Sequence, residues 1–471
     1  MGLAALLCAG TVLSPLSAGT AAAGTVPACV AQADAPNGGP NSGPDGGTAP
    51  GPTTVATLQQ AYECLFAHAY AGPVLDSRVV LVSAFHSLTE ELQRRGADRP
   101  NAVLPALTGR PARDWAAFAR TYRALLDSVP QDGALRDALA RATVKGMLDS
   151  LHDNHTGWVK GAPGAGAARY TLGIVEAPDG RPTPDIRDVD GPLHLRSVDP
   201  GSPAATAGLK PGDVLVDVNG VPVTLNGHLT PGVLEWLHPG SADPVRLTVT
   251  RPATGASRSV DLTPVPERPR PAPAPAVDLV APDVARITLP DFSPGAVDEA
   301  LRQLAALRAR SPLRGVVVDV RGNSGGRSEE VAKLLGAFVH GRTTSSDCDI
   351  RGHCTPNRTD DSVPLLGLPP VVLTDGYCAS ACDDFTGAVK DLGLGRLIGA
   401  RTAGVVAGKA AAYTLDDGST LIFPRTHHVS ANGETVDGVG VPVDVEAPLT
   451  AHDLSTGTDP ALAEALRTLH A

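Results

Sequence analysis

The sequence predicts a multidomain α+β protein with a helical, a β and an α/β part, in that order. Apolar residues recur at helical spacing over residues 55–160, and short β-type runs between glycine and proline turns occupy residues 165–265. After residue 278 strands alternate with helices, a pattern that is typical of a mostly parallel, buried sheet. A chain of 471 residues is also too long for one core.

The composition narrows the function classes. Lys plus Arg number 39 against 50 Asp plus Glu, and the net charge of −11 argues against a nucleic-acid partner. Aromatic residues make up only 3% of the chain, so its cores must consist mainly of Ala, Val and Leu.

The N-terminus predicts export. Residues 1–23 form an uncharged, apolar segment that ends in small residues, as a signal peptide does, although a basic start is missing. A disordered apolar tail is the alternative, and Pro15 makes the segment a poor membrane span. Residues 24–54 are rich in Gly, Pro, Ala and Thr and predict a flexible leader. We therefore expect a secreted or extracytoplasmic protein without a stable membrane span.

The cysteines agree with export. Apart from Cys8, the chain has an even number of cysteines, as disulfide-bonded proteins do. Closeness in sequence favours one set of pairs among several possible ones: Cys29 with Cys64, Cys348 with Cys354, and Cys378 with Cys382. Two alternatives stay open. Cys348, His353 and Cys354 would be metal ligands in one, and Cys29 would carry a lipid in the other.

Residues 55–160 predict a helical domain. Three groups of apolar residues share a helical face: Leu58, Tyr62, Leu65 and Ala69; Val79, Val82, Phe85 and Leu88; and Trp115, Phe118 and Tyr122. A fourth helix is expected to begin near Asp132, and Gly157 is expected to act as its C-terminal stop.

A turn of small residues around Ser380 is the first candidate for chemistry. An apolar run at 370–373 precedes this turn, and a helix-like run at 385–389 follows it. Such a turn places a serine hydroxyl at a helix N-terminus, where backbone amides and the helix dipole stabilise an oxyanion. The turn therefore predicts a nucleophile, and a serine that only caps the helix is the alternative.

A glycine turn upstream predicts a second part of the same site. The buried strand expected at 316–320 leads to Gly325 and Gly326, whose amides can approach a substrate carbonyl closely. Together with the amide of Ala381, one of these glycines would form an oxyanion hole. No Lys-Ser or Lys-Thr pair follows the glycines, which removes a phosphate-binding P-loop.

These motifs, in this order, resemble the C-terminal processing (tail-specific) serine peptidases, in the branch that includes the tricorn core protease. The resemblance covers roughly residues 56–450 and rests on four segments: Asp319 to Gly326, Ala379 to Asp383, Gly399 to Gly404, and Asp437 to Asp444. It implies a ClpP/crotonase-like α/β peptidase domain over residues 278–471, after a proline-rich linker at 266–277. It implies no metal and no organic cofactor.

Residues 165–265 resemble a PDZ domain. The signature is a short helix closed by Gly208, a Pro-Gly-Asp turn and a strand that enters an Asn-Gly hairpin turn. PDZ domains bind C-terminal peptides by strand addition. The resemblance implies that substrate C-termini bind at one loop, formed by Tyr170, Leu172, Gly173 and Ile174. A spacer or lid without peptide binding is the alternative.

The resemblance also indicates which group activates the serine. Lysine-type members carry their base in a Thr-x-Gly-Lys turn, and Thr402-Ala403-Gly404 matches that turn but is followed by Val405. Tricorn-like members use a histidine near the end of the helical domain, which His155 matches, and Asp437 takes the place of their orienting glutamate. Lys409 stays open as an alternative base.

The sequence thus predicts a secreted serine endopeptidase that acts on proteins or peptides. Ser380 would attack the scissile carbonyl, His155 would act as general base and then acid, and Asp437 would orient the imidazole. A catalytically inactive, PDZ-containing peptide-binding protein on a peptidase scaffold is the alternative.

Overall fold

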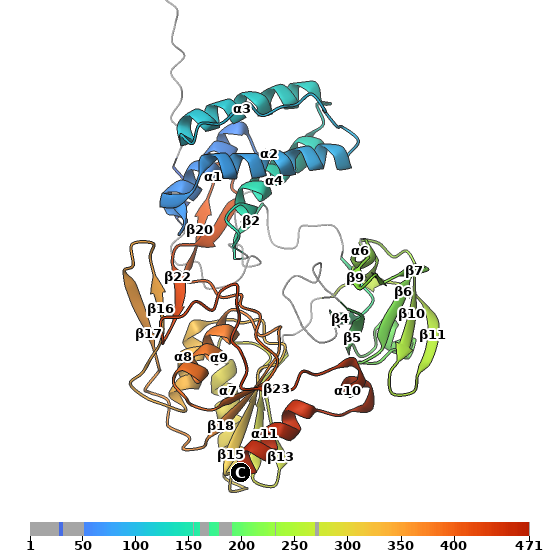
Figure 1. Ribbon diagram of the computed structural model, residues 1–471, viewed down its shortest axis with the longest axis vertical. Helices are drawn as coiled ribbons and strands as arrows, with labels where there is room; N and C mark the ends of the chain where they lie inside the picture. The colour runs from blue at the N-terminus through green and yellow to red at the C-terminus, as the bar shows by residue number, and fades with distance from the viewer. Residues whose placement is uncertain are drawn as a thin grey trace, which may run out of the picture.

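The computed structural model describes residues 28–31, 51–153, 155–160, 169–178, 191–230, 232–268 and 273–470. The expected signal segment, most of the leader and part of the proline-rich linker lie outside these residues. Figure 1 shows a helical bundle at the top, an α/β part below it and a β part to the side. The mixture of helices and sheets expected from the sequence is confirmed.

Four helices form the bundle: α1 Val55–His68, α2 Ser77–Arg94, α3 Pro111–Ser128 and α4 Gly133–Asp149, with the short 3₁₀-helix η1 Gly72–Val74 after α1. Side chains cap the first amides of three of them, Thr54 for α1, Asp76 for α2 and Asp132 for α4. The start expected near Asp132 is therefore confirmed.

The face predicted for α2 is wrong in its first half, whereas Leu88 is buried as expected and Phe85 packs against the core. Val79 and Val82 are 52% and 55% exposed, whereas Val80, Leu81 and Ala84 are buried. The buried stripe faces α4, which approaches closely at Gly146, because a Cβ atom there would lie 2.5 Å from the carbonyl oxygen of Ser83. Both stripes of α2 have helical spacing, and only the position of α4 decides between them.

The expected stop at Gly157 is also wrong. Helix α4 ends at Asp149, and Gly157 instead begins strand β2, Gly157–Val159. This strand belongs to a four-stranded sheet of order β1-β20-β21-β2. The other strands are β1 Val30–Ala31, β20 Ala410–Thr414 and β21 Thr420–Pro424.

The hairpin of β20 and β21 leaves the α/β part and packs into the helical bundle. Tyr413, Leu415, Leu421 and Phe423 are buried in the same core as the bundle helices. Figure 1 shows the hairpin in orange, rising from the α/β part toward α1 and α4. The stretch 278–471 is therefore not one separate structural unit.

The main sheet of the β part has the order β11-β10-β6-β5-β4, with β7 paired to β6, and the pairs β12-β3 and β8-β9 form two small sheets. Its strands and short helices are β3 Tyr170–Thr171, β4 Ile174–Pro178, β5 Leu193–Val198, α5 Pro203–Thr206, β6 Val214–Val218, β7 Val221–Pro222, β8 Thr224–Leu225, β9 His228–Leu229, α6 Val233–Leu237, β10 Val245–Arg251, β11 Ala256–Leu262 and β12 Val265–Pro266. Asn219 and Gly220 have φ angles of 53° and 79° between β6 and β7, which confirms the expected hairpin turn.

The α/β part contains a sheet of order β13-β14-β15-β18-β19-β23. Its elements are β13 Ala276–Ala281, β14 Val284–Thr288, α7 Ala296–Arg308, β15 Gly315–Asp319, α8 Ser328–Gly336, β16 Thr343–Cys348, β17 Cys354–Arg358, β18 Pro370–Thr374, α9 Ala381–Asp391, β19 Arg396–Gly399, β22 His427–Ser430, β23 Val445–Glu446, α10 Ala451–Thr456 and α11 Pro460–His470. Neighbouring strands from β14 to β23 are parallel, and β13 is antiparallel to β14.

The layers of the α/β part place two loops at one edge of the sheet. Helices α7, α8 and α9 pack on one face, and α11 packs on the other. Strands β15 and β18 are direct neighbours, so the segments that follow them leave the sheet side by side. These segments are the glycine turn and the serine turn of the sequence analysis. Ligands bind outside the carboxyl ends of strands in many open α/β sheets.

Three disulfides join the pairs that closeness in sequence favours: Cys29–Cys64, Cys348–Cys354 and Cys378–Cys382. Because these sulfurs are already bonded, the alternatives of a metal site at Cys348 and Cys354 and of a lipid on Cys29 are both wrong. Among the described residues, no helix combines the length and the apolar character that crossing a bilayer requires.

Candidate active site

Ser380 lies in a strained turn between β18 and α9. Its φ of 58° and ψ of −118° are rare for a residue with a side chain, and such strain persists only where neighbours hold the backbone. The Ser380 amide donates to the carbonyl oxygen of Val405 at 2.6 Å and to Asp383 Oδ2 at 3.1 Å. The Cys378–Cys382 disulfide closes the turn across Ser380. The hydroxyl thus sits on a fixed backbone at a helix N-terminus.

The glycine turn after β15 packs directly against the serine turn. A Cβ atom on Gly325 would lie 2.7 Å from the Cβ of Ser380, and one on Gly326 would lie 2.4 Å from the carbonyl oxygen of Phe292. Both glycines also have positive φ angles, 111° and 145°. Only glycine allows this close approach.

Asn323 holds the glycine turn in place and occupies the amide of one of its two glycines. This fully buried residue accepts a hydrogen bond from the Gly325 amide at its Oδ1, 2.8 Å away, and from the Ala379 amide at its carbonyl oxygen, 3.1 Å away. The Gly325 amide is therefore occupied. Within the described part of the chain, the amides of Gly326 and Ala381 have no acceptor, so these two are the donors left for an oxyanion. The sequence did not distinguish Gly325 from Gly326.

His155 reaches the α/β part because the strand that follows it pairs with β21. In this pairing Gly157 lies opposite Ile422, and the indole nitrogen of Trp158 donates to Ser419 Oγ at 2.9 Å. A residue at the end of the helical bundle is thereby held beside the segment that runs from Thr402 to Asp437.

Asp153 is a member of the site that the sequence analysis missed. Its Oδ1 accepts the backbone amide of His155 at 2.8 Å and lies 3.5 Å from His155 Nδ1. The signal was present in the sequence as an acid two residues before the histidine. Nothing in the sequence showed that this carboxylate turns back toward the ring.

Asp437 lies in the same electrostatic cluster. Burial raises the pKa of its carboxyl above the usual range, the amide of Val406 opposes this shift with a 3.2 Å hydrogen bond to Oδ1, and the charge of Asp153 raises the pKa further. His155 and His427 interact with the same carboxylate and lower its pKa. Asp437 is thus close enough to both histidines for their charges to matter.

Ser380 and Asp437 are connected through two consecutive residues. Val405 accepts the amide of Ser380, and Val406 donates to Asp437. His155 Nδ1 is buried and has no hydrogen-bond partner, and no hydrogen bond joins His155 to Ser380 among the described residues. Catalytic hydrogen bonds are often long before substrate binds.

Lys409 does not lie in this cluster. It is exposed at the start of β20, where its amide donates to Thr426 Oγ1 at 2.7 Å and its carbonyl oxygen accepts from the Arg425 amide at 2.9 Å. A lysine base must be kept neutral by burial, and an exposed lysine lacks that environment.

The loop expected to bind peptide C-termini lies partly inside the core of the β part. Leu172 and Ile174 are only 1% and 9% exposed, and Tyr170 pairs with Pro266 through β3 and β12. The Gly173 amide donates to Thr171 Oγ1 at 2.9 Å. Strand β4 is the edge of its sheet, and edge strands are where strand addition takes place.

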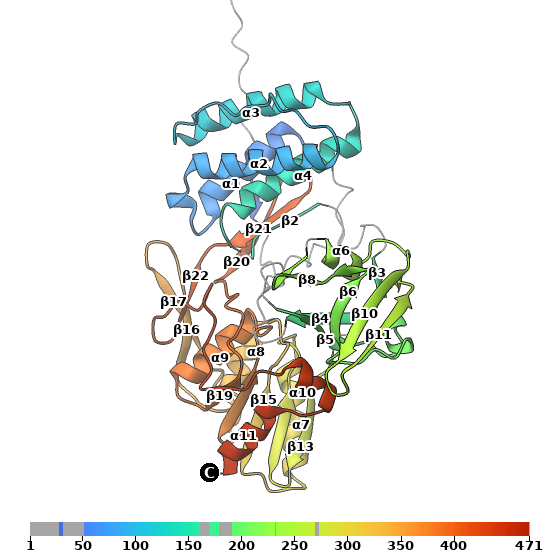
Figure 2. The same cartoon turned by 45° about the vertical axis from the view of Figure 1, so that its right-hand side comes forward.

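The β part touches the serine turn directly. The guanidinium of Arg196 lies 4.4 Å from the ring centroid of Tyr377 and 3.2 Å from Asp375 Oδ2. Asp375 Oδ1 accepts the amides of Gly322 and Tyr377, at 2.9 and 3.0 Å, and so ties the two active-site turns together. The Tyr377 hydroxyl donates to the carbonyl oxygen of Glu176 on β4 at 3.3 Å. Figure 2 shows β4 and β5 on the side of the β part that faces the α/β part.

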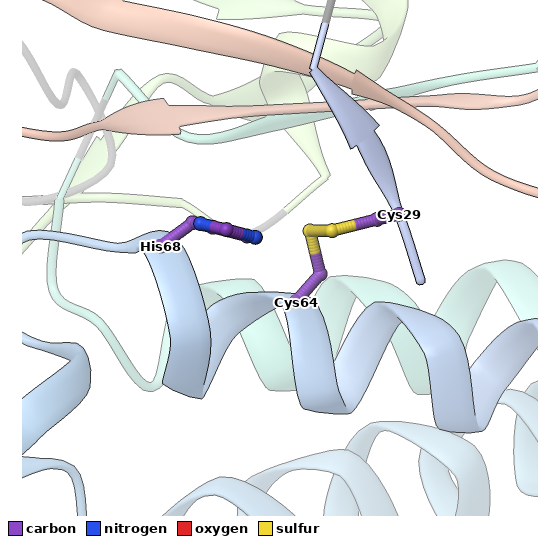
Figure 3. Close-up of side chains that lie close together, drawn as sticks. All are labelled: Cys29, Cys64 and His68. Atoms are coloured by element: carbon purple, nitrogen blue, oxygen red, sulfur yellow. A yellow bond between two sulfur atoms is a disulfide. The ribbon is translucent and has the colours of Figure 1, made fainter. Parts of the chain in front are cut away.

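One group of potential metal ligands occurs among the described residues: Cys29, Cys64 and His68, whose ligand atoms lie within 4.8 Å of one another. Figure 3 shows that the two cysteines are joined by a disulfide and that the imidazole of His68 points toward it. His68 also stacks on Tyr413, with ring centroids 4.9 Å apart. Disulfide sulfurs are not thiolates, so this cluster anchors strand β1 and does not offer a metal site.

Comparison with known proteins agrees with the two resemblances. Residues 283–447 match Peptidase family S41, and residues 194–251 match a PDZ domain. The chain contains a family S41 peptidase domain. The matched region includes Ser380, Asp437 and the glycine turn, whereas His155 lies before it.

Two relatives of this chain have names that describe proteases. Tricorn protease homolog 1 of Streptomyces coelicolor is 30% identical over 371 residues, 75% of this chain and 32% of its own length. The carboxy-terminal processing protease CtpA of Bacillus subtilis is 24% identical over 313 residues, 66% of this chain and 65% of its own length. The chain thus spans about a third of the tricorn relative and about two thirds of CtpA.

Solved structures share the fold over most of the chain. The photosystem II D1 C-terminal processing protease superimposes with a TM-score of 0.50 at 19% identity, covering 86% of this chain and 98% of its own. Mature CPAF complexed with lactacystin superimposes with a TM-score of 0.52 at 15% identity, covering 88% and 97%. At these identities the likeness concerns the fold alone.

Proposed function

We propose that this chain is an extracytoplasmic serine endopeptidase that uses Ser380 as nucleophile. The observation that carries the proposal is the strained serine turn at the N-terminus of α9, packed against a glycine turn that leaves no room for a Cβ atom. This arrangement would present a hydroxyl and free amides to one substrate carbonyl, which is what acyl transfer requires. The disulfides support a location outside the cytoplasm.

The residues of the site divide the chemistry among them. His155 takes the proton of Ser380 as the hydroxyl oxygen attacks the scissile carbonyl carbon, and the resulting oxyanion accepts hydrogen bonds from the amides of Gly326 and Ala381. His155 then gives the proton to the leaving amine, and a water molecule hydrolyses the acyl-enzyme by the same route. Asp437 orients and stabilises the imidazolium, and the described residues supply every proton transfer in this scheme.

The PDZ domain would engage the C-terminus of a protein or peptide substrate. Strand β4 is an edge strand, and its Glu176 carbonyl contacts Tyr377 beside the nucleophile. A peptide added to this edge would therefore run close to the catalytic turn.

A fluorophosphonate probe, which forms a covalent bond with an activated serine, tests the proposal. We expect the full chain to be labelled at one residue, with labelling and peptide hydrolysis both lost in Ser380→Ala. A folded full chain that is neither labelled nor hydrolytic would instead favour the alternative of a catalytically inactive PDZ protein that binds peptides.

A further inference from the structure

Asp383 is a buried carboxylate that holds two separate parts of the candidate site. It lies at the third position of α9 and is fully buried. Its Oδ2 accepts the amide of Ser380 at 3.1 Å and that of Val405 at 2.9 Å, while its Oδ1 accepts the amide of Gly404 at 3.0 Å. One carboxylate thus accepts three backbone amides from two segments.

The segment held by Asp383 includes Thr402-Ala403-Gly404, which resembles the Thr-x-Gly-Lys turn of lysine-type members. Val405 follows where such a turn has its lysine, so the segment would supply no base. Its contacts instead lead to Asp437. The carbonyl oxygen of Gly404 accepts the Gly438 amide at 2.7 Å, and the Val406 amide donates to Asp437 Oδ1 at 3.2 Å.

Close packing makes this connection rigid. A Cβ atom on Gly404 would lie 2.3 Å from the amide nitrogen of Gly440, so the backbones touch. Thr402 Oγ1 accepts the Val441 amide at 2.7 Å, which fixes the other end of the contact. A shift of the segment therefore moves the backbone next to Asp437, and the Asp383 carboxylate holds this segment at Gly404 and Val405.

We propose that Asp383 is the positioning residue that sets the distance between the nucleophile Ser380 and the orienting acid Asp437, through the segment Thr402 to Val406. Asp383 touches neither substrate nor the reacting atoms. The inference rests on the proposed function, because Asp383 is assigned a role in the geometry of the proposed catalytic site. Placement errors of about 1 Å cost on the order of 100-fold in rate in enzymes of this kind.

The test compares Asp383→Asn with Asp384→Asn in the full chain. An asparagine keeps the size of the side chain but offers one acceptor oxygen and places an NH₂ group against an amide. Asp384 is the matched control, because it is also buried on α9 but its carboxylate lies 3.6 Å from His428 Nε2 and, among the described residues, accepts no amide of the held segment. For Asp383→Asn we expect kcat to fall by roughly 10- to 100-fold, with KM within about threefold of wild type.

Asp384→Asn should leave kcat within about threefold of wild type, even if both variants lower the melting temperature. A purely structural role for Asp383 predicts similar losses of kcat in the two variants. Equal losses, or an unchanged kcat in Asp383→Asn, would overturn the assignment.

Amide hydrogen exchange provides a readout that does not depend on catalysis. In the wild-type chain the amides of Gly404 and Val405 should be protected, and Asp383→Asn should accelerate their exchange selectively. Fast exchange of both amides in the wild type would contradict the proposal even if the variant failed to fold. A wild-type chain with protected amides but no peptidase activity would refute the proposed function while leaving the role of Asp383 in holding the segment intact.

Discussion

Asp437 shows at the level of one residue how function and stability oppose each other in this site. Burial and the neighbouring charge of Asp153 raise the pKa of the Asp437 carboxyl above its value in the unfolded chain. The folded state therefore loses stability as the pH rises from the unfolded pKa through the folded one. The ionised carboxylate is the form that burial disfavours, yet it is the form that would orient His155.

Asp437→Asn should separate the two effects. The amide oxygen can still accept the Val406 amide, while the buried charge is removed. We expect a melting temperature at neutral pH equal to or above that of wild type, with the difference shrinking as the pH falls below the folded pKa. We expect kcat to fall by about 100- to 10,000-fold, as in other triads whose acid is neutralised. A variant that is less stable at neutral pH but retains its kcat would contradict this view of Asp437.

Single residues of the site were predictable where a local pattern forces the chemistry. Ser380, Gly325 and Gly326 follow apolar strands in turns of small residues, and the structure places these turns in contact. The interaction of Asp153 with the ring of His155 was not predictable, because the orientation of a side chain in an irregular segment depends on its neighbours in space.

The element that depends most on cysteine pairing is the serine turn. The Cys378–Cys382 disulfide spans the first turn of α9, and the Cys29–Cys64 disulfide fixes strand β1 beside β20. Thiol titration of the exported protein, denatured but not reduced, should therefore find few or no free thiols, because Cys8 lies in the expected signal peptide. Six free thiols would refute the disulfides and remove the main support for an extracytoplasmic location.

Elements with a strong local signal were the predictable ones. The helix start at Asp132 and the hairpin turn at Asn219 have side chains or glycines that specify a conformation. The buried face of α2 was not predictable, because the helix carries two apolar stripes and packing against α4 buries one of them. The packing of the hairpin of β20 and β21 into the helical bundle was not predictable either, because its core partners lie hundreds of residues away in sequence.

At the scale of the whole molecule, the PDZ domain directly contacts the candidate active site. Arg196 and Glu176 of the PDZ domain touch Asp375 and Tyr377, which border the nucleophile. Peptide binding at the edge of β4 would take place next to this surface. We therefore expect a peptide bound at this edge to affect the turn that carries Ser380.

Peptide binding by the full chain with the substitution Ser380→Ala tests the selection of C-termini. Peptides that end in a small apolar residue with a free carboxylate should bind at least about tenfold more tightly than their C-terminally amidated versions, because backbone amides of a PDZ loop recognise the carboxylate. Affinity is measured by calorimetry, and hydrolysis of the same peptides by the wild type is compared separately. Equal affinities would assign the domain to the spacer alternative.

The identity of the base is the central claim, because it joins the helical bundle, the β20–β21 hairpin and the α/β part in one site. The direct measurement is the turnover of a peptide substrate by His155→Ala and by Lys409→Ala, each compared with wild type. Each variant is first shown to have the melting temperature of wild type. If His155 takes the proton of Ser380, His155→Ala should lower kcat by roughly 1,000-fold or more, while Lys409→Ala stays within about threefold. The reverse pattern, with turnover lost in Lys409→Ala and kept in His155→Ala, would contradict the account.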